Sequence, residues 1–244
     1  MIGRKIKRIL FLIVDYYRFI RISLMNNDRK FSYIYKSKYW QNIEEGSLSG
    51  GGSNYISTSH IKKELGEFIE CNQIKSMIDI PCGDWKWMSE LDLMGIDYFG
   101  YDIVDDLILE NKKRYAKENI SFGVKNLIYE KLPKSDLIII RDLLVHLDHN
   151  DIIKCLLNLD SSDFKFVGIT NYPSLLSHKN RIFGDYLRLG DKWRPLNLSI
   201  YPYNLPSPNF DINDTNNLTE IDKGKYISIW SKSNFNIAKM EKLL

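Results

Sequence analysis

Short apolar runs alternate with stretches of helical spacing from residue 76 onward. The runs rich in β-branched and aromatic residues predict strands, at 76–80, 97–102, 120–124, 136–141 and 164–170. Between them, apolar positions repeat with helical spacing and predict helices at 104–117 and 150–159, with a shorter helix after Gly83. The fully apolar run 137–140 is typical of a strand buried on both faces. This alternation predicts an α/β fold with a doubly wound, mostly parallel sheet.

Different segments flank this alternating region. Ahead of it, the glycines at 50–52 lead into a helix whose apolar face holds Ile61, Leu65 and Phe68. Behind it, residues 172–225 are rich in aromatic residues, proline and asparagine, and Tyr226 to Ser231 have the pattern of one more strand. A chain of 244 residues suits one domain with additions. We expect an N-terminal helical arm over 1–45, a main domain over 46–244 and, within it, a C-terminal cap around 172–225.

Acidic residues and one glycine lie where the first predicted strand ends. In open parallel sheets, ligands bind at the carboxyl ends of the strands. Gly83 allows the backbone to approach a ligand closely, and Asp79 and Asp84 place hydrogen-bond acceptors beside it. Such acceptors suit a ligand with positive charge, as the sulfonium and ammonium groups of S-adenosylmethionine have, and they would repel a pyrophosphate. The loop therefore favours S-adenosylmethionine over NAD.

The next two strand ends offer further polar side chains. Asp102 ends the second strand at a distance along the chain where an acidic side chain can accept hydrogen bonds from both ribose hydroxyls. Alternatively, Asp102 caps the helix that begins near Val104, because Asp is a good N-cap residue. Asn126 follows the third strand, where a side chain that reads adenine is expected, but it could equally belong to an ordinary turn.

These strand ends together resemble a known family. Ile78 to Gly83, the step Tyr101-Asp102 and the run from Arg141 to Leu147 are similar to the class I S-adenosylmethionine-dependent methyltransferases, best over residues 47–170. The resemblance implies a Rossmann-like seven-stranded sheet of order 3-2-1-4-5-7-6 with an antiparallel last strand, and S-adenosylmethionine as the cofactor. Of the three glycines usual in the first loop only Gly83 remains, which leaves a non-catalytic binding or scaffold subunit as an alternative.

The expected cofactor site extends along these loops. The glycines at 50–52 could fold over the cofactor's carboxylate through free backbone N–H groups, or they could form a plain connector. Trp87 is a candidate to shield the methyl donor, although it could simply pack in the core. The predicted cofactor-binding residues are Ser49, Gly50, Ser53, Asp79, Pro81, Cys82, Gly83, Asp84, Trp87, Asp102, Ile103, Asn126, Arg141 and Asp142.

Titratable side chains gather after the fourth predicted strand. Methyl transfer to a hydroxyl requires an aligned acceptor and removal of its proton. His146 has the most suitable intrinsic pKa for a catalytic base, and Asp142 could orient it or serve in its place. A metal site built from Asp142, His146 and Asp148 is a weaker alternative, and we predict no metal.

Side chains of the predicted cap are candidates to bind the methyl acceptor. Aromatic faces with amides and an arginine suit sugar rings, hydroxyls and phosphates, although these residues could equally seal the edge of the sheet. The predicted acceptor-binding residues are His146, Asn171, Tyr172, Trp193, Arg194 and Tyr203. We predict O-methylation of a sugar-containing or other polar small molecule, in surface polysaccharide biosynthesis. A natural-product or lipid methyltransferase is the alternative within the same enzyme class.

Charge is distributed unevenly along the chain. Residues 1–30 hold eight basic and two acidic side chains, a net charge of +6, whereas the whole chain has +3. A near-neutral body with a basic arm is unlike a nucleic-acid-binding protein. The apolar run 9–14 is too short to span a membrane, so the arm could lie on an anionic membrane surface or recruit a partner. Three cysteines without disulfide or zinc spacing indicate a cytoplasmic protein, at the inner face of the membrane if the arm binds there.

Overall fold

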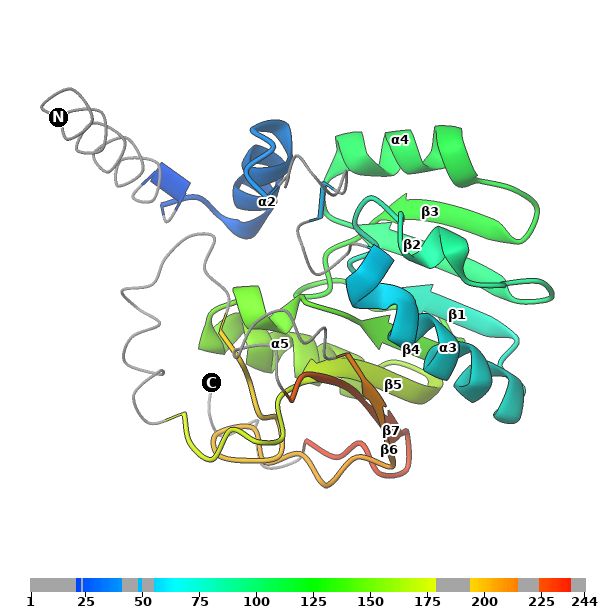
Figure 1. Ribbon diagram of the computed structural model, residues 1–244. Coiled ribbons are helices and arrows are strands. Elements are labelled where there is room, and N and C mark those ends of the chain that lie inside the picture. Colours follow the sequence, from blue (N-terminus) through cyan, green and yellow to red (C-terminus); the bar gives the residue numbers. More distant parts are fainter. Residues whose placement is uncertain are drawn as a thin grey trace, which may run out of the picture.

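A single seven-stranded sheet organises the computed structural model, which describes residues 21–22, 24–40, 48–49, 55–178, 194–214 and 224–237 (Figure 1). The strands are β1 (Ser76–Asp79), β2 (Asp97–Asp102), β3 (Ile120–Val124), β4 (Ser135–Ile140), β5 (Phe164–Asn171), β6 (Phe210–Asn213) and β7 (Tyr226–Ser231). Their order, β3-β2-β1-β4-β5-β7-β6, confirms the order that the resemblance implied. The strands β1 to β5 run parallel to one another, and β7 is antiparallel to β5 and β6.

The central strand β4 is buried on both faces, as its apolar sequence predicts. Ile138 and Ile140 belong to a core formed with the apolar side of α5 (His149–Asp160). Leu137 and Ile139 belong to a second core, on the face that α3 (Tyr55–Cys71) covers. Because successive side chains of a strand point to opposite faces, one four-residue run supplies both cores.

The predicted helices are present, with one exception. The helices α4 (Asp105–Tyr115) and α5 lie within two residues of the ranges predicted from apolar spacing. The helix predicted after Gly83 is wrong: the described segment there forms only one 3-10 turn, η2 (Met88–Glu90). Trp85 has a φ of 57°, in the left-handed region, and this conformation interrupts a right-handed helix directly after the loop.

The position of the edge strand β6 in the sequence was not predicted, although the seven-stranded order implied such a strand. Of its residues only Ile212 is buried, so its sequence has no alternation to distinguish it from the surrounding proline-rich segment. It pairs with β7, which the sequence did predict. The pairing continues past the strand ends, where the Asp214 amide donates to the Lys225 carbonyl at 3.0 Å.

The helix α2 (Asn27–Lys36) lies across the carboxyl edge of the sheet (Figure 1). The side-chain amide of Asn27 donates to the Asp151 carboxylate of α5 at 2.7 Å. At the other end of the helix, Lys36 forms an ion pair with Asp106 of α4 at 3.0 Å. Residues 27–36 of the predicted arm are therefore fixed against the main domain. Among the described residues, no helix combines the length and apolarity needed to cross a bilayer.

Candidate functional site

A cavity opens at the carboxyl edge of the sheet, beneath α2. It encloses about 900 Å³ of empty space, and this volume includes space open to solvent. Its walls come from α2 and the turn after it, and from the segments that follow β1, β2, β3 and β4. The predicted residues among its lining are Ser49, Pro81, Cys82, Gly83, Trp87, Asp102, Ile103, Asn126, Arg141, Asp142 and His146.

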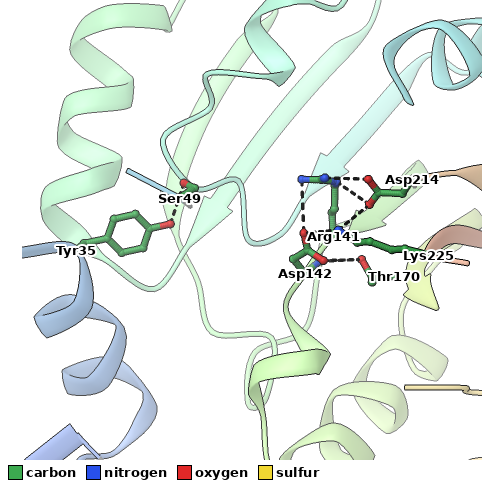
Figure 2. A network of polar contacts seen from close by, with 7 residues as sticks. All are labelled: Tyr35, Ser49, Arg141, Asp142, Thr170, Asp214 and Lys225. Carbon is green, nitrogen blue, oxygen red and sulfur yellow. Dashed lines mark hydrogen bonds and ion pairs between the residues drawn. The ribbon is translucent and has the colours of Figure 1, made fainter. Parts of the chain in front are cut away.

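The loop after β1 approaches the segment at residues 48–49 closely. Gly83 has a φ of 57°, and a Cβ atom on it would lie 2.5 Å from the Ser49 Oγ. That Oγ accepts a hydrogen bond from the Asp84 amide at 3.0 Å, while the Leu48 amide donates to the Asp84 carboxylate at 2.7 Å. The Tyr35 hydroxyl of α2 lies 3.0 Å from the Ser49 Oγ (Figure 2). Only glycine fits this junction of α2, loop and strand end.

Asp102 lies in the cavity wall and also holds the surrounding backbone. Its carboxylate accepts hydrogen bonds from the Gly83 amide at 3.2 Å and the Val104 amide at 3.1 Å. Burial raises the pKa of Asp102 to about 6, although these backbone bonds act in the opposite direction. Val104 is itself the N-cap residue of α4, so the bond to its amide lies before the first turn and Asp102 does not occupy the N-cap position. Each carboxylate oxygen keeps a lone pair, so the position also fits ribose hydroxyls.

Two predicted acidic ligands do not line the cavity. Asp79 is 1% exposed, and its carboxylate accepts a hydrogen bond from the Tyr98 hydroxyl at 2.7 Å. Burial raises its pKa to about 7, although the Tyr98 bond and the charge of Arg141 lower it. Asp84 instead holds the Leu48 amide. Asp79 therefore joins β1 to β2, and Asp84 joins the loop after β1 to the segment at residues 48–49.

Asn126 forms a turn and also contacts the arm. Its Oδ1 accepts from the backbone amide of Ile128 at 2.9 Å, as in an ordinary turn. Its side-chain Nδ2 donates to the Asp28 carboxylate of the arm at 3.1 Å. It lines the cavity together with Ile103 and Leu127. Apolar side chains beside an amide can hold a flat heterocycle by packing and hydrogen bonding.

A buried network of charges lies at the end of β4 (Figure 2). Arg141 makes two hydrogen bonds to Asp214, at 2.9 and 3.0 Å. Lys225 lies 3.0 Å from Asp214 and 2.8 Å from Asp142. The Asp142 amide donates to the Thr170 hydroxyl at 2.8 Å, which fixes the residue in its left-handed conformation. Two cations and two carboxylates thus compensate one another, as buried charges require.

This network argues against Asp142 as a catalytic base. Burial acts to raise its pKa, but the charges of Lys225 and Arg141 outweigh burial and hold the pKa well below its usual range. A carboxylate stabilised in this way is a weak proton acceptor. Asp142 nevertheless lines the cavity, where it presents a permanent negative charge.

His146 lies in the 3-10 turn η3 (Leu144–His146), on the side of the cavity that α2 covers. The Trp40 ring stacks obliquely on the imidazole with centroids 5.0 Å apart, and the Phe31 ring meets it edge-on at 6.5 Å. The predicted base therefore faces aromatic side chains of the arm.

Most of the other predicted acceptor residues pack inside the protein. Asn171 is 1% exposed and bonds to the Ser228 hydroxyl and the Leu198 amide at 2.9 Å each. Tyr172 and Tyr203 are buried in the core beside α5, and the Arg194 amide donates to the Val145 carbonyl at 3.0 Å. None of the four lines the cavity, in agreement with the alternative that they seal the sheet edge. The predicted residues Gly50, Ser53 and Trp193 lie outside the described part of the chain.

The sequence reasoning missed two groups of site residues. The first comprises Asn27, Phe31, Tyr35 and Trp40, which line the cavity from the arm. Their aromatic spacing was a possible signal, because Phe31 and Tyr35 are four residues apart on one helix face. The second group is Asp214 and Lys225, and no local pattern distinguishes them from surface residues.

Comparison with known proteins gives a likeness of fold. No protein-family model and no curated protein sequence matches the chain. The N-methyltransferase NodS from Bradyrhizobium japonicum WM9 superposes with a TM-score of 0.50 and 11% identity, over 72% of this chain and 97% of that one. PigF, solved with S-adenosylhomocysteine, superposes with a TM-score of 0.50 and 13% sequence identity, over 71% of this chain and 55% of PigF. The chain therefore has the Rossmann-like fold of the class I S-adenosylmethionine-dependent methyltransferases.

Proposed function

We propose that the chain is an S-adenosylmethionine-dependent methyltransferase. The observation that carries this proposal is the cavity itself, in which consecutive strand ends supply Gly83, Asp102 and Asn126. In this order, a tight glycine loop lets the protein backbone approach an adenosine ligand closely, an acidic side chain can bind its ribose, and an amide can bind its base. The fold supports the same reading, since ligands of such sheets bind at this edge.

The residues present fit this cofactor. Asp102 can accept from the ribose hydroxyls, and Ile103 with Asn126 can hold the adenine. Asp142 offers negative charge to the cationic end of the molecule. When bound, S-adenosylmethionine supplies an electrophilic methyl group on its sulfonium. The protein then has to orient an acceptor in line with that group and exclude water.

We propose a ring-bearing hydroxyl compound as the acceptor, such as a sugar in surface polysaccharide biosynthesis. The support comes from Phe31 and Trp40, which line the cavity and whose rings both contact the His146 ring. Aromatic faces stack on the apolar faces of rings, and a neutral imidazole can take the hydroxyl proton. His146 is accordingly the proposed general base.

Calorimetric titration with S-adenosylmethionine tests the cofactor proposal. We expect binding by the wild type and weaker binding by Asp102→Asn, by about tenfold, because a charged acceptor is lost. The matched control is Asp97→Asn, the same change at the exposed opposite end of β2. Absence of binding by the folded wild type, or equal affinity of the two variants, would contradict the proposal.

Release of S-adenosylhomocysteine across nucleotide sugars, glycans, phenols and lipids tests the acceptor proposal. With an accepted substrate, His146→Gln should lower turnover by about 100-fold or more and retain cofactor binding. His149→Gln is the control, because His149 contacts Tyr203 outside the cavity. Turnover restricted to lipids would favour the alternative of a lipid methyltransferase. Cofactor binding without any turnover would favour the binding subunit.

We also propose that the basic arm holds the protein at an anionic membrane surface, on the cytoplasmic side. The support is the net charge of +6 in residues 1–30 beside an apolar run. Residues 1–20 lie outside the described part of the chain. Sedimentation with vesicles that contain phosphatidylserine should retain the protein, and neutral vesicles or exchange of Arg4, Lys5, Lys7 and Arg8 to Gln should not.

A further inference from the structure

The four charged side chains at the end of β4 are unequally exposed. The side chains of Arg141, Lys225 and Asp214 are 4%, 8% and 1% exposed, whereas the side chain of Asp142 is 30% exposed. Asp142 also lines the cavity. Of the network's two carboxylates, it is therefore the one that a ligand in the cavity can reach.

Asp214, which follows β6, and Lys225, which precedes β7, determine the charge that such a ligand meets at the cavity wall. Asp214 bonds twice to Arg141 and once to Lys225, so its carboxylate compensates cations that otherwise both face Asp142. Lys225 in turn holds the Asp142 carboxylate at 2.8 Å. Without Asp214 the network would carry a net positive charge and repel a cation at the cavity wall.

We propose that Asp214 and Lys225 are positioning residues of the cofactor site, which hold the Asp142 carboxylate ready for the positively charged methionyl end of S-adenosylmethionine. This inference rests on the proposed function. The methionyl end carries the sulfonium and the ammonium: the ammonium can donate hydrogen bonds to a fixed carboxylate, and the sulfonium is attracted to it by charge alone. The hairpin of β6 and β7 thereby acts on the cofactor through Asp142.

The test compares ligands that share adenosine but differ in this end. S-Adenosylmethionine has both cationic groups, S-adenosylhomocysteine keeps the ammonium, and 5′-methylthioadenosine has neither. In calorimetric titrations, Asp214→Asn should weaken S-adenosylmethionine binding by about tenfold or more, as expected for a charged contact, and leave 5′-methylthioadenosine binding unchanged. An equal loss for S-adenosylhomocysteine assigns Asp142 to the ammonium, and a smaller loss assigns it to the sulfonium.

A second variant distinguishes an effect of the network's charge from an effect of packing, and it keeps the test possible if Asp214→Asn does not fold. Asp214→Asn combined with Lys225→Met leaves one cation and one carboxylate, so the network is neutral again. We expect this double variant to bind S-adenosylmethionine more tightly than Asp214→Asn does. If Asp214→Asn does not fold, the double variant is compared with the wild type instead: it should bind S-adenosylmethionine more weakly than the wild type and 5′-methylthioadenosine equally well. A role limited to packing would make the double variant no better than the single one.

The matched control is Asp211→Asn, the same exchange at an exposed residue of β6. It should bind all three ligands as the wild type does. Folded variants that bind S-adenosylmethionine with wild-type affinity, or that lose it and 5′-methylthioadenosine equally, would overturn the inference and leave the proposed function intact. Failure of the wild type to bind S-adenosylmethionine would instead overturn the proposed function and this inference with it.

Discussion

Gly83 is the residue at which backbone conformation and close packing coincide. Its φ of 57° is unfavourable for any residue with a Cβ, and the nearby Ser49 Oγ leaves no space for that atom. Gly95 separates the two effects, because it has a φ of 74° but a Cβ atom added to it would meet no atom within 4 Å. The pair therefore distinguishes the cost of backbone strain from the cost of the close approach.

We expect Gly95→Ala to lower the free energy of unfolding by about 1 to 2 kcal/mol, the cost of the left-handed conformation alone. Gly83→Ala should lower it further and also weaken S-adenosylmethionine binding, because Ser49 has to move away from the loop. Urea unfolding and calorimetry measure both quantities. Equal losses of stability in the two variants, with binding intact in both, would show that the approach of Ser49 is unimportant.

Asp79 makes stability depend on pH. Its folded-state pKa of about 7 lies above the ordinary value of 3.8, so the folded protein binds this proton more tightly than the unfolded chain. The resulting stability is complete below about pH 4 and is lost as the pH rises through 7. The loss can reach about 4 kcal/mol, since one pKa unit corresponds to about 1.4 kcal/mol.

We therefore expect the wild type to be less stable at pH 8 than at pH 5, and Asp79→Asn to show a smaller difference because its side chain does not titrate. Some dependence should remain, since the pKa of Asp102 is also raised, to about 6. Urea unfolding at the two pH values measures this, with Asp97→Asn as the control that keeps the wild-type difference. An Asp79→Asn profile identical to the wild-type profile would refute the assignment.

At the scale of elements, α2 and α5 begin in the same way but occupy different places. The Asn26 side chain accepts from the Arg29 amide at the start of α2, and the Asp148 side chain accepts from the Asp151 amide at the start of α5. Loss of either cap should cost about 1 kcal/mol. Only α2 covers the cavity, so the two losses should have different consequences for a bound ligand.

We expect Asn26→Ala to increase the dissociation rate of S-adenosylmethionine several-fold, because 1 kcal/mol of local helix stability corresponds to about a fivefold change in an equilibrium. Asp148→Ala should lower the urea midpoint and leave the dissociation rate near that of the wild type. Stopped-flow displacement by S-adenosylhomocysteine measures the rate. If both variants release the cofactor equally fast, α2 does not limit its exit.

At the scale of the whole molecule, the sequence predicted what local patterns encode. Apolar periodicity located β4 and α5, and the residues that end β1 and β2 indicated the cavity. The cavity's other wall depends on contacts between distant segments, such as Asn126 with Asp28 and Asp142 with Lys225. A buried lysine has the same letter as a surface lysine, and periodicity does not tell which distant segment a helix face meets. The long-range half of the site was therefore not predictable.

This assembly from distant segments predicts how the cofactor should affect the whole chain. The cavity lining extends from Asn27 to Leu147, and the charge network adds Lys225. A ligand at 100 times its dissociation constant should raise the free energy of unfolding by about 2.7 kcal/mol. Amide exchange of α2 should slow as well, because α2 is part of the wall.

Hydrogen exchange with and without S-adenosylmethionine checks this expectation, with α3 as the internal reference because its residues are absent from the cavity lining. Amides of α2 should gain protection at ligand concentrations that leave the fast-exchanging ends of α3 unchanged. If α2 exchanges equally fast in both states while the loop after β1 becomes protected, the cofactor binds to the sheet edge alone. The arm would then contribute to the acceptor side of the cavity and not to retention of the cofactor.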